Sequence, residues 1–343
     1  MSKILELLKI LCTLDGPSGN EDGVREFIMS EISPVCDAKV DRMGNIIAFK
    51  KGKNDSEYKV MLDAHMDEVG VIVKGITDRG FLKFETVGGI ETDSLMCKRV
   101  RFGSTVGVIG AKPIHQSSPE ERKKLPSEDS LYIDIGANNK EDVERVISLG
   151  DIGTFVGEWA DLTDGIFRSK AIDDRVGCAV LIDMLKQDAE YDFYATFTVG
   201  EELGLRGAKT ATYNVDPDFA IALECTTAAD THSNSGNKVC EVGKGVVLSF
   251  MDRATLYDRK LYDFTLNLAK EKGIAVQIKK AVAGGNNAGA IHLTKGGVRA
   301  ITLSLPGRYI HSSSTVGSEF DLLSQRSLAE ALLSELARGN LTE

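Results

Sequence analysis

Five segments of the chain carry carboxylates or imidazoles where a predicted strand or helix begins or ends. The central segment, KAIDDRVGC at 170–178, places Asp173 and Asp174 before an apolar run that predicts a helix. Aspartates commonly cap helices, so this pair alone fits a structural role equally well. The other segments are LDAHMDEVG at 62–70, TVGEELGLRGA at 198–208, IALECTTAAD at 221–230 and GRYIHSSST at 307–315. Together the five contain the donors of a two-metal hydrolase, with Asp173 as the expected bridge.

The spacing within two of these segments predicts separate roles for neighbouring side chains. His65 and Asp67 lie two residues apart, so they point to the same side of an extended strand. A ligating imidazole commonly donates its other N–H to a carboxylate, which makes Asp67 a supporting partner for His65. Glu201 and Glu202 are adjacent and cannot both point the same way. One of them can therefore face a metal while the other reaches an attacking water.

Glu224 and His311 complete the set of donors. Glu224 follows an apolar run, IAL at 221–223, and a carboxylate there needs a partner because burying it unpaired is costly. His311 follows a predicted strand and the Pro306–Gly307 turn. Taken one at a time, these residues also fit plainer roles, as core histidines, solvated strand ends or ion pairs. As a set of imidazoles and carboxylates without cysteine pairs, they suit zinc or a similar divalent ion.

Composition excludes several classes of protein. The 343 residues include 41 Lys and Arg against 51 Asp and Glu, a net charge of −10, which argues against nucleic-acid binding. No apolar run approaches the ~18–20 residues of a membrane span. The N-terminal run mixes Lys and Glu into its apolar residues, unlike a secretory signal. The six cysteines include no CxxC pair, so we expect free thiols and a cytoplasmic protein.

The elements that must position these side chains are predicted helices and strands that alternate along much of the chain. Helix 3–12 is followed by strands at 36–41, 45–52 and 58–65. From 71 to 161 short strand-like pieces alternate with turns, which predicts a small β-barrel-like domain inserted between the catalytic parts 1–70 and 162–343. The alternation then resumes with helices at 176–187, 204–212, 256–272 and 319–338 and strands at 191–200, 219–225, 245–251, 274–280 and 299–305. We therefore predict an α/β fold with a mainly parallel sheet and helices on both faces.

Several motifs in this order resemble the M42 family of metallo-aminopeptidases. They are GPSGNE near the N-terminus, DRMGN at 41–45, AHMD at 64–67, AIDDRVGC at 171–178, GEELGLRGA at 200–208 and RYIHSS at 308–313. The similarity runs from about residue 5 to 335. It implies a zinc-aminopeptidase-like fold, a PDZ-like or β-barrel insert that mediates dimerisation, and dimers that build a tetrahedral dodecamer. It also implies a metal-dependent hydrolysis of N-terminal residues from short peptides.

The resemblance assigns roles to individual residues. Asp173 would bridge two divalent metal ions, zinc in the first place, with cobalt or manganese as alternatives. His65 and Glu224 would complete one metal site, and Glu202 and His311 the other. Glu201 resembles the general base and Asp67 the carboxylate that supports His65. The family also implies a cis peptide between Asp173 and Asp174.

Two positions concern the substrate pocket. GGNNAGA at 284–290 stands where the family commonly has GGTDAGA, so Asn286 and Asn287 replace Thr and Asp and remove a carboxylate near the site. We expect Asn287 to contact the substrate. Arg308 is a candidate cation for an acidic substrate side chain. The preference for acidic, basic or apolar residues stays open.

Three other functions remain as alternatives. A carboxypeptidase or deacylase of the M20 type would use similar donors but act on blocked peptides. A glycosidase would need a flanking pair of carboxyl groups rather than a bridged metal pair. A weakly active assembly or binding protein of the same fold would follow if the change in GGNNAGA disabled the site.

Overall fold

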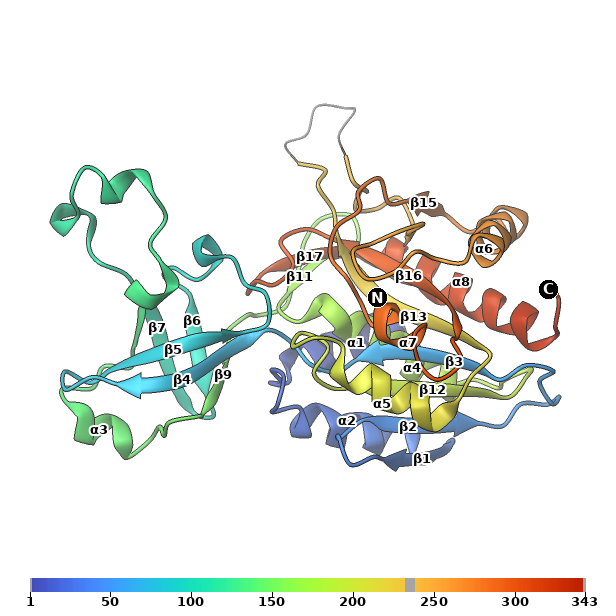
Figure 1. The fold of residues 1–343 in the computed structure, drawn as a ribbon, viewed down its shortest axis with the longest axis horizontal. Coiled ribbons are helices and arrows are strands. Elements are labelled where there is room, and N and C mark those ends of the chain that lie inside the picture. The colour runs from blue at the N-terminus through green and yellow to red at the C-terminus, as the bar shows by residue number, and fades with distance from the viewer. Residues whose placement is uncertain (1, 232–237, 342–343) are drawn as a thin grey trace.

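The computed structural model describes residues 2–231 and 238–341. These residues form two lobes, a larger α/β body and a smaller β lobe made from a middle stretch of the chain (Figure 1). The candidate site residues all belong to the α/β body. The fold is therefore best described from the sheet of that body outward.

The body is built on an eight-stranded sheet of order β1-β2-β12-β3-β13-β16-β14-β15. The four middle strands, β12, β3, β13 and β16, run parallel. The outer strands join antiparallel, β2 to β12 on one side and β14 to β16 on the other. The bounds are β1 (Asp37–Val40), β2 (Ile46–Lys50), β3 (Val60–His65), β12 (Phe193–Thr198), β13 (Phe219–Thr227), β14 (Val246–Leu248), β15 (Val276–Ile278) and β16 (Arg299–Gly307).

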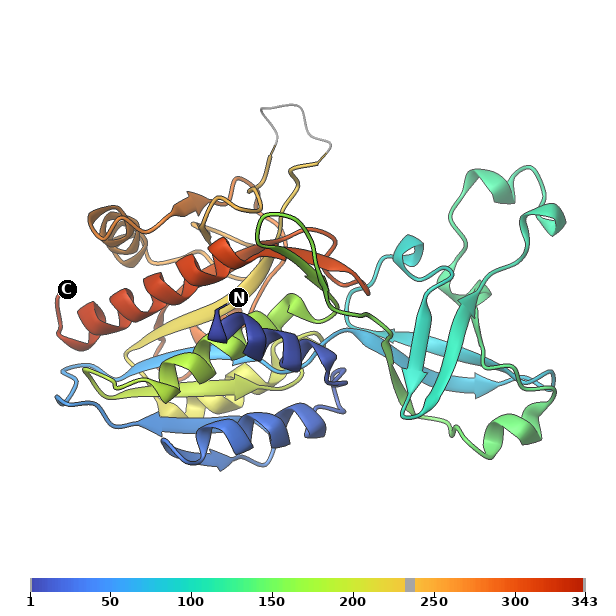
Figure 2. The ribbon, with the colours of Figure 1, turned by 180° about the vertical axis from the view of Figure 1, so that it is seen from behind.

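Helices cover both faces of this sheet. Helices α1, α2, α4 and α8 lie on the face seen in Figure 2, whereas α5 and α7 lie on the face seen in Figure 1. Helix α6 contacts α8 and β16. The bounds are α1 (Lys3–Thr13), α2 (Asp22–Ile32), α4 (Ile172–Lys186), α5 (Arg206–Val215), α6 (Arg259–Glu271), α7 (Ala288–Ile291) and α8 (Glu319–Ala337). Coverage on both faces explains why β3 is buried along its whole length.

The local sequence accounts for the first helix of this cover. The Ser2 hydroxyl accepts a hydrogen bond from the N–H of Leu5 and caps α1. Ile4, Leu8 and Leu11 recur at helical spacing and are buried, and α1 packs against α4. Helix α4 carries Asp173 in its first turn, so this packing supports the site from behind.

The smaller lobe is a closed barrel of order β4-β5-β8-β7-β6-β9. It has its own core, which includes Phe84, Ile109, Ile133 and Phe155. The bounds are β4 (Gly70–Ile76), β5 (Phe81–Val87), β6 (Arg99–Phe102), β7 (Thr105–Gly110), β8 (Tyr132–Asp134) and β9 (Ile152–Phe155), with the short helix α3 (Lys140–Glu144) before β9.

A small three-stranded sheet, β10-β11-β17, lies where the chain returns from the barrel. Its strands are β10 (Ala160–Asp161), β11 (Ile166–Ser169) and β17 (Thr315–Ser318). Ser169 of β11 pairs with Thr315 of β17. This pairing brings together the loop that precedes Asp173 and the loop that contains His311.

The predicted α/β class, the mainly parallel middle of the sheet and the inserted barrel are confirmed. Some predicted elements are longer than the observed ones. Strand β14 ends at Leu248 instead of 251; Met251 forms an isolated bridge with Leu256 around a turn in which the Asp252 side chain accepts the N–H groups of Ala254 and Thr255. Among the described residues, no helix is both long and apolar enough to cross a membrane.

Candidate dinuclear metal site

The candidate donors meet at the carboxyl edge of the parallel strands. His65 is the last residue of β3, Glu224 lies near the end of β13, and Glu202 follows β12. Asp173 comes from the first turn of α4 and His311 from the loop between β16 and β17. Ligands of α/β proteins bind at this edge because the chain leaves the sheet there. The fold thus gathers five side chains that are far apart in the sequence.

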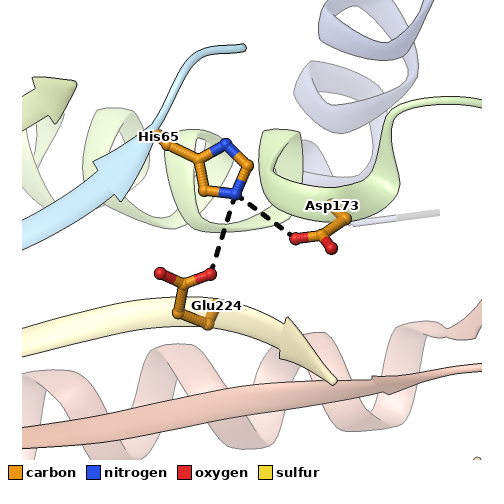
Figure 3. Close-up of side chains that lie close together, drawn as sticks. All are labelled: His65, Asp173 and Glu224. Carbon is orange, nitrogen blue, oxygen red and sulfur yellow. Dashed lines mark ion pairs between the residues drawn. The ribbon is translucent and has the colours of Figure 1, made fainter. Parts of the chain in front are cut away.

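Three of these side chains form a first cluster (Figure 3). The Nε2 atom of His65 lies 3.4 Å from Oδ1 of Asp173 and 3.7 Å from Oε2 of Glu224. His65 and Glu224 are buried, and one donor atom from each of the three residues lies within 4.8 Å of the others. These separations suit three ligands around one ion, because each would lie about 2.0–2.2 Å from it.

A second cluster shares Asp173 with the first. The Nε2 atom of His311 lies 3.4 Å from Oδ2 of Asp173 and 3.3 Å from Oε1 of Glu202. One donor atom of each residue again lies within 4.8 Å of the others. The two oxygens of Asp173 therefore face different histidines, as a carboxylate that bridges two ions must do.

Hydrogen bonds to backbone carbonyls orient both imidazoles. Nδ1 of His65 lies 3.0 Å from the carbonyl oxygen of Asp67, and Nδ1 of His311 lies 2.6 Å from that of Gly89. A carbonyl oxygen can only accept, so each Nδ1 carries the hydrogen and donates it. In a neutral ring the lone pair then lies on Nε2, which is the atom that faces Asp173.

Asp67 contacts both His65 and the corner that carries Glu201 and Glu202. Its carboxylate lies 3.5 Å from Nδ1 of His65, and its own carbonyl oxygen lies closer to that nitrogen, at 3.0 Å. Its two carboxylate oxygens also accept the backbone N–H groups of Glu201 and Glu202, both at 3.1 Å. The hydroxyl of Ser18 donates to Oδ2 at 2.5 Å. Asp67 thus holds the corner after β12 from which both glutamates project.

Glu201 has the environment of a general base. Burial raises the pKa of Glu201 to about 7; the nearby imidazoles of His65 and His311 oppose this rise, and the carboxylates of Asp67 and Asp173 add to it. Among the described residues, no group is hydrogen-bonded to the Glu201 carboxylate. A carboxylate of this kind can accept a proton near neutral pH.

The neighbouring carboxylates are crowded into a buried space. Burial raises the pKa values of Glu202 and Glu224 well above the usual range. Burial acts to raise the pKa of Asp173, but the two facing imidazoles of His311 and His65 outweigh it and lower this pKa below the usual range. Such a concentration of buried carboxylates calls for positive charge, since unpaired buried anions are costly.

The residues present fit divalent metal ions. Each cluster offers one imidazole and two carboxylates, a donor set that suits zinc, cobalt or manganese. Oδ1 of Asp173 is buried and has no hydrogen-bond partner among the residues that the structure describes, although it lies opposite Nε2 of His65. A bound cation would satisfy this oxygen and the two imidazole lone pairs at once. The peptide between Asp173 and Asp174 is cis, as the resemblance implied.

Other buried groups that were not predicted from the sequence hold the ligand-bearing segments. Gln325 of α8 donates to the carbonyl oxygens of Glu224 and Leu303 at 3.0 and 2.8 Å. Glu68 accepts from the ammonium of Lys170 at 2.6 Å and from Arg175 at 3.4 Å. These contacts join distant segments, so no local pattern in the sequence indicated them.

Both residues that were predicted to contact the substrate have side chains that bind other residues of the protein. Asn287 is fully buried, and its amide nitrogen donates to Asp63 and Thr198 beneath the site. Asp63 therefore supplies a carboxylate beside Asn287, where the departure from the family motif had suggested the loss of one. Arg308 makes a two-pronged ion pair with Asp230, with both N–O distances 2.7 Å.

The chain is similar to known aminopeptidases over nearly its whole length. The model of the M42 glutamyl aminopeptidase family matches residues 44–328. The lysyl aminopeptidase of Pyrococcus furiosus is 34% identical, with 96% of this chain and 97% of the relative covered.

Two solved structures have the same fold. A TET aminopeptidase from a marine-sediment Thaumarchaeota archaeon superposes with a TM-score of 0.93 at 32% identity, covering 99% of this chain and 100% of that one. The TET1 peptidase of Pyrococcus horikoshii superposes with a TM-score of 0.84 at 32% identity, covering 96% and 99%. Together with the family match, these similarities show that the chain belongs to the M42 glutamyl aminopeptidase family.

Proposed function

We propose that this metal-dependent aminopeptidase uses two divalent ions, bridged by Asp173, to remove N-terminal residues from short peptides. The observation that carries the proposal is the pair of clusters that share Asp173, each with one imidazole and two carboxylates. His65 and Glu224 would hold one ion, and Glu202 and His311 the other. Zinc suits these donors, and cobalt and manganese are accepted by the same set.

The protein's own groups define the remaining chemistry. Bound ions would polarise the scissile carbonyl and lower the pKa of an attacking water. Glu201 takes the proton from that water and passes it to the leaving amine, because no described group is hydrogen-bonded to its carboxylate and its pKa lies near neutrality. Asp67 keeps Glu201 and Glu202 in their relative positions through the two backbone N–H groups.

The surroundings of the site bear on the substrate. The Arg308 guanidinium is paired with Asp230, so its charge is already balanced and it offers little attraction to an acidic substrate side chain. One relative is named a lysyl aminopeptidase, whereas the family is named after a glutamyl aminopeptidase, so these names point to different substrate side chains. We therefore assign short peptides with a free N-terminal amine as the substrate and assign no preferred side chain.

We further propose that residues 71–161 act as a dimerisation and lid domain, and that dimers assemble into a tetrahedral dodecamer. Support comes from the closed barrel in this stretch and from the related TET1 peptidase, which assembles into a tetrahedron or an octahedral shell. The six free cysteines support a cytoplasmic location. Light scattering of the purified protein measures the assembly.

The function is tested by comparing matched peptides with a free and an acetylated N-terminus, using protein reloaded with metal. Release of the first residue from the free peptide alone supports an aminopeptidase. Cleavage of the acetylated peptide instead would support a deacylase of the M20 type. If neither peptide is cleaved although two ions are bound, the assembly or binding function gains support.

A further inference from the structure

The ladder between β3 and β13 stops before the metal ligands. The paired residues run from Val60 and Phe219 to Asp63 and Ala222. His65 and Glu224 lie two residues beyond the last pair. The ladder therefore does not fix the 3.7 Å separation between Nε2 of His65 and Oε2 of Glu224.

Asn287 connects the strands at this point. Its backbone N–H donates to Oε1 of Glu224 on β13 at 3.2 Å. Its side-chain Nδ2 donates to Oδ2 of Asp63 on β3 at 2.7 Å and to the hydroxyl of Thr198 on β12 at 2.9 Å. Asn287 immediately precedes α7 and is fully buried. One residue thus contacts three strands at the point where β3 and β13 separate.

The contact with Glu224 determines which of its oxygens faces the metal cluster. Because Oε1 accepts the N–H of Asn287, Oε2 is the oxygen that faces Nε2 of His65. The side-chain bonds of Asn287 hold that N–H in place. Groups that hydrogen-bond to the ligands of a metal orient these ligands and tune the affinity of the site for the metal.

Asp63 explains why an amide stands at position 287. Its Oδ2 accepts from Asn287, and its Oδ1 accepts from the hydroxyl of Thr196 at 2.6 Å. Asp63 is buried and lies on the strand that ends with His65. A carboxylate at position 287 would face that of Asp63 at hydrogen-bond distance, and two like charges so close in a buried space repel.

We propose that Asn287 is a positioning residue for the His65–Glu224 metal site, anchored by Asp63. This inference rests on the proposed two-ion function. It does not give Asn287 a contact with the substrate. Asn287 and Asp63 form a matched pair of amide and carboxylate, so exchanging the two residue types should preserve the hydrogen bond between them.

The test measures the affinity of single metal sites in metal-stripped protein titrated with Co²⁺. His311→Ala leaves the His65–Glu224 site, and His65→Ala leaves the Glu202–His311 site. Added to His311→Ala, Asn287→Ala should weaken Co²⁺ binding by about 10- to 100-fold. Added to His65→Ala, the same change should leave Co²⁺ affinity unaltered.

The exchanged pair provides a second test that does not depend on how well Asn287→Ala folds. In the His311→Ala background, Asn287→Asp should weaken Co²⁺ binding, and Asn287→Asp with Asp63→Asn should restore it. Thr196→Val is the matched control. It removes the other bond to Asp63, so it should lower the melting temperature without changing the relative affinities of the two sites.

The outcomes separate the inference from the proposed function. Unmodified protein that binds no Co²⁺ contradicts both. If unmodified protein binds two ions and Asn287→Ala weakens both sites equally, or neither, the positioning role of Asn287 is wrong while the two-ion site stands. Failure of the exchanged pair to restore affinity would equally contradict the anchoring by Asp63.

Discussion

The Nδ1 atom of His311 lies 2.6 Å from the carbonyl oxygen of Gly89, which joins a ligand of the catalytic body to the barrel. The preceding residue, Gly88, has a φ of +89°. A Cβ at Gly88 would lie 3.2 Å from both Cβ and Oε2 of Glu202 and 2.8 Å from Cγ1 of Val69. The Gly88–Gly89 turn of the barrel therefore forms one wall of the second cluster.

Gly88→Ala should weaken metal binding at the Glu202–His311 site. The added methyl group pushes on Glu202, and the positive φ adds strain. The number of ions retained after dialysis, measured by elemental analysis, should fall from two towards one. Gly136→Ala is the matched control, because Gly136 also has a positive φ but a Cβ there meets open space. Equal metal content in the two variants would contradict a role for the contact between position 88 and Glu202.

Asp173→Asn should abolish binding of both ions, whereas His311→Ala should abolish binding of one. The reason is geometric, since Oδ1 of Asp173 faces His65 and Oδ2 faces His311. Calorimetric titration with Zn²⁺ gives the stoichiometry directly. His115→Ala, which changes an exposed histidine of the barrel, should keep two ions. Retention of one tight site in Asp173→Asn would argue against a bridging role.

Lys170→Met should destabilise the fold rather than change the chemistry. The Lys170 ammonium lies 2.6 Å from Glu68, and both side chains are at most 3% exposed. Removing one partner of a buried ion pair costs about 3–5 kcal/mol, measurable as a shift in urea unfolding. Lys74→Met, which breaks exposed pairs with Glu85 and Asp129, should change stability little because such pairs are solvated. Adding Glu68→Gln to Lys170→Met should recover part of the loss.

Much of the fold could be predicted because its signals are local. Helical spacing marks α1 and α8, near-continuous apolar runs mark β3 and β13, and the absence of a long helix marks the barrel. The five candidate ligands stand directly at or beside the ends of such elements. Their side-chain types and places in the order of strands were enough to group them around Asp173.

The rest depended on contacts between distant segments. Asn287 was predicted to contact the substrate, but its partner Asp63 lies 224 residues away within an apolar run, where nothing indicated a carboxylate in need of an amide. The pairing of Arg308 with Asp230 and the bond from Gln325 to the backbone of Glu224 likewise cross the fold. Spacing in the sequence cannot show which way an isolated polar side chain turns.

The central claim is that two ions and Glu201 hydrolyse the bond after a free N-terminal residue. The most direct measurement is release of p-nitroaniline from a panel of aminoacyl-p-nitroanilides by metal-stripped protein, with Zn²⁺, Co²⁺ or Mn²⁺ added back, beside Glu201→Gln. We expect release that needs added metal and falls by about 10²- to 10⁴-fold in Glu201→Gln, while that variant still binds two ions. Release that persists without metal, or unchanged release by Glu201→Gln, would contradict the account.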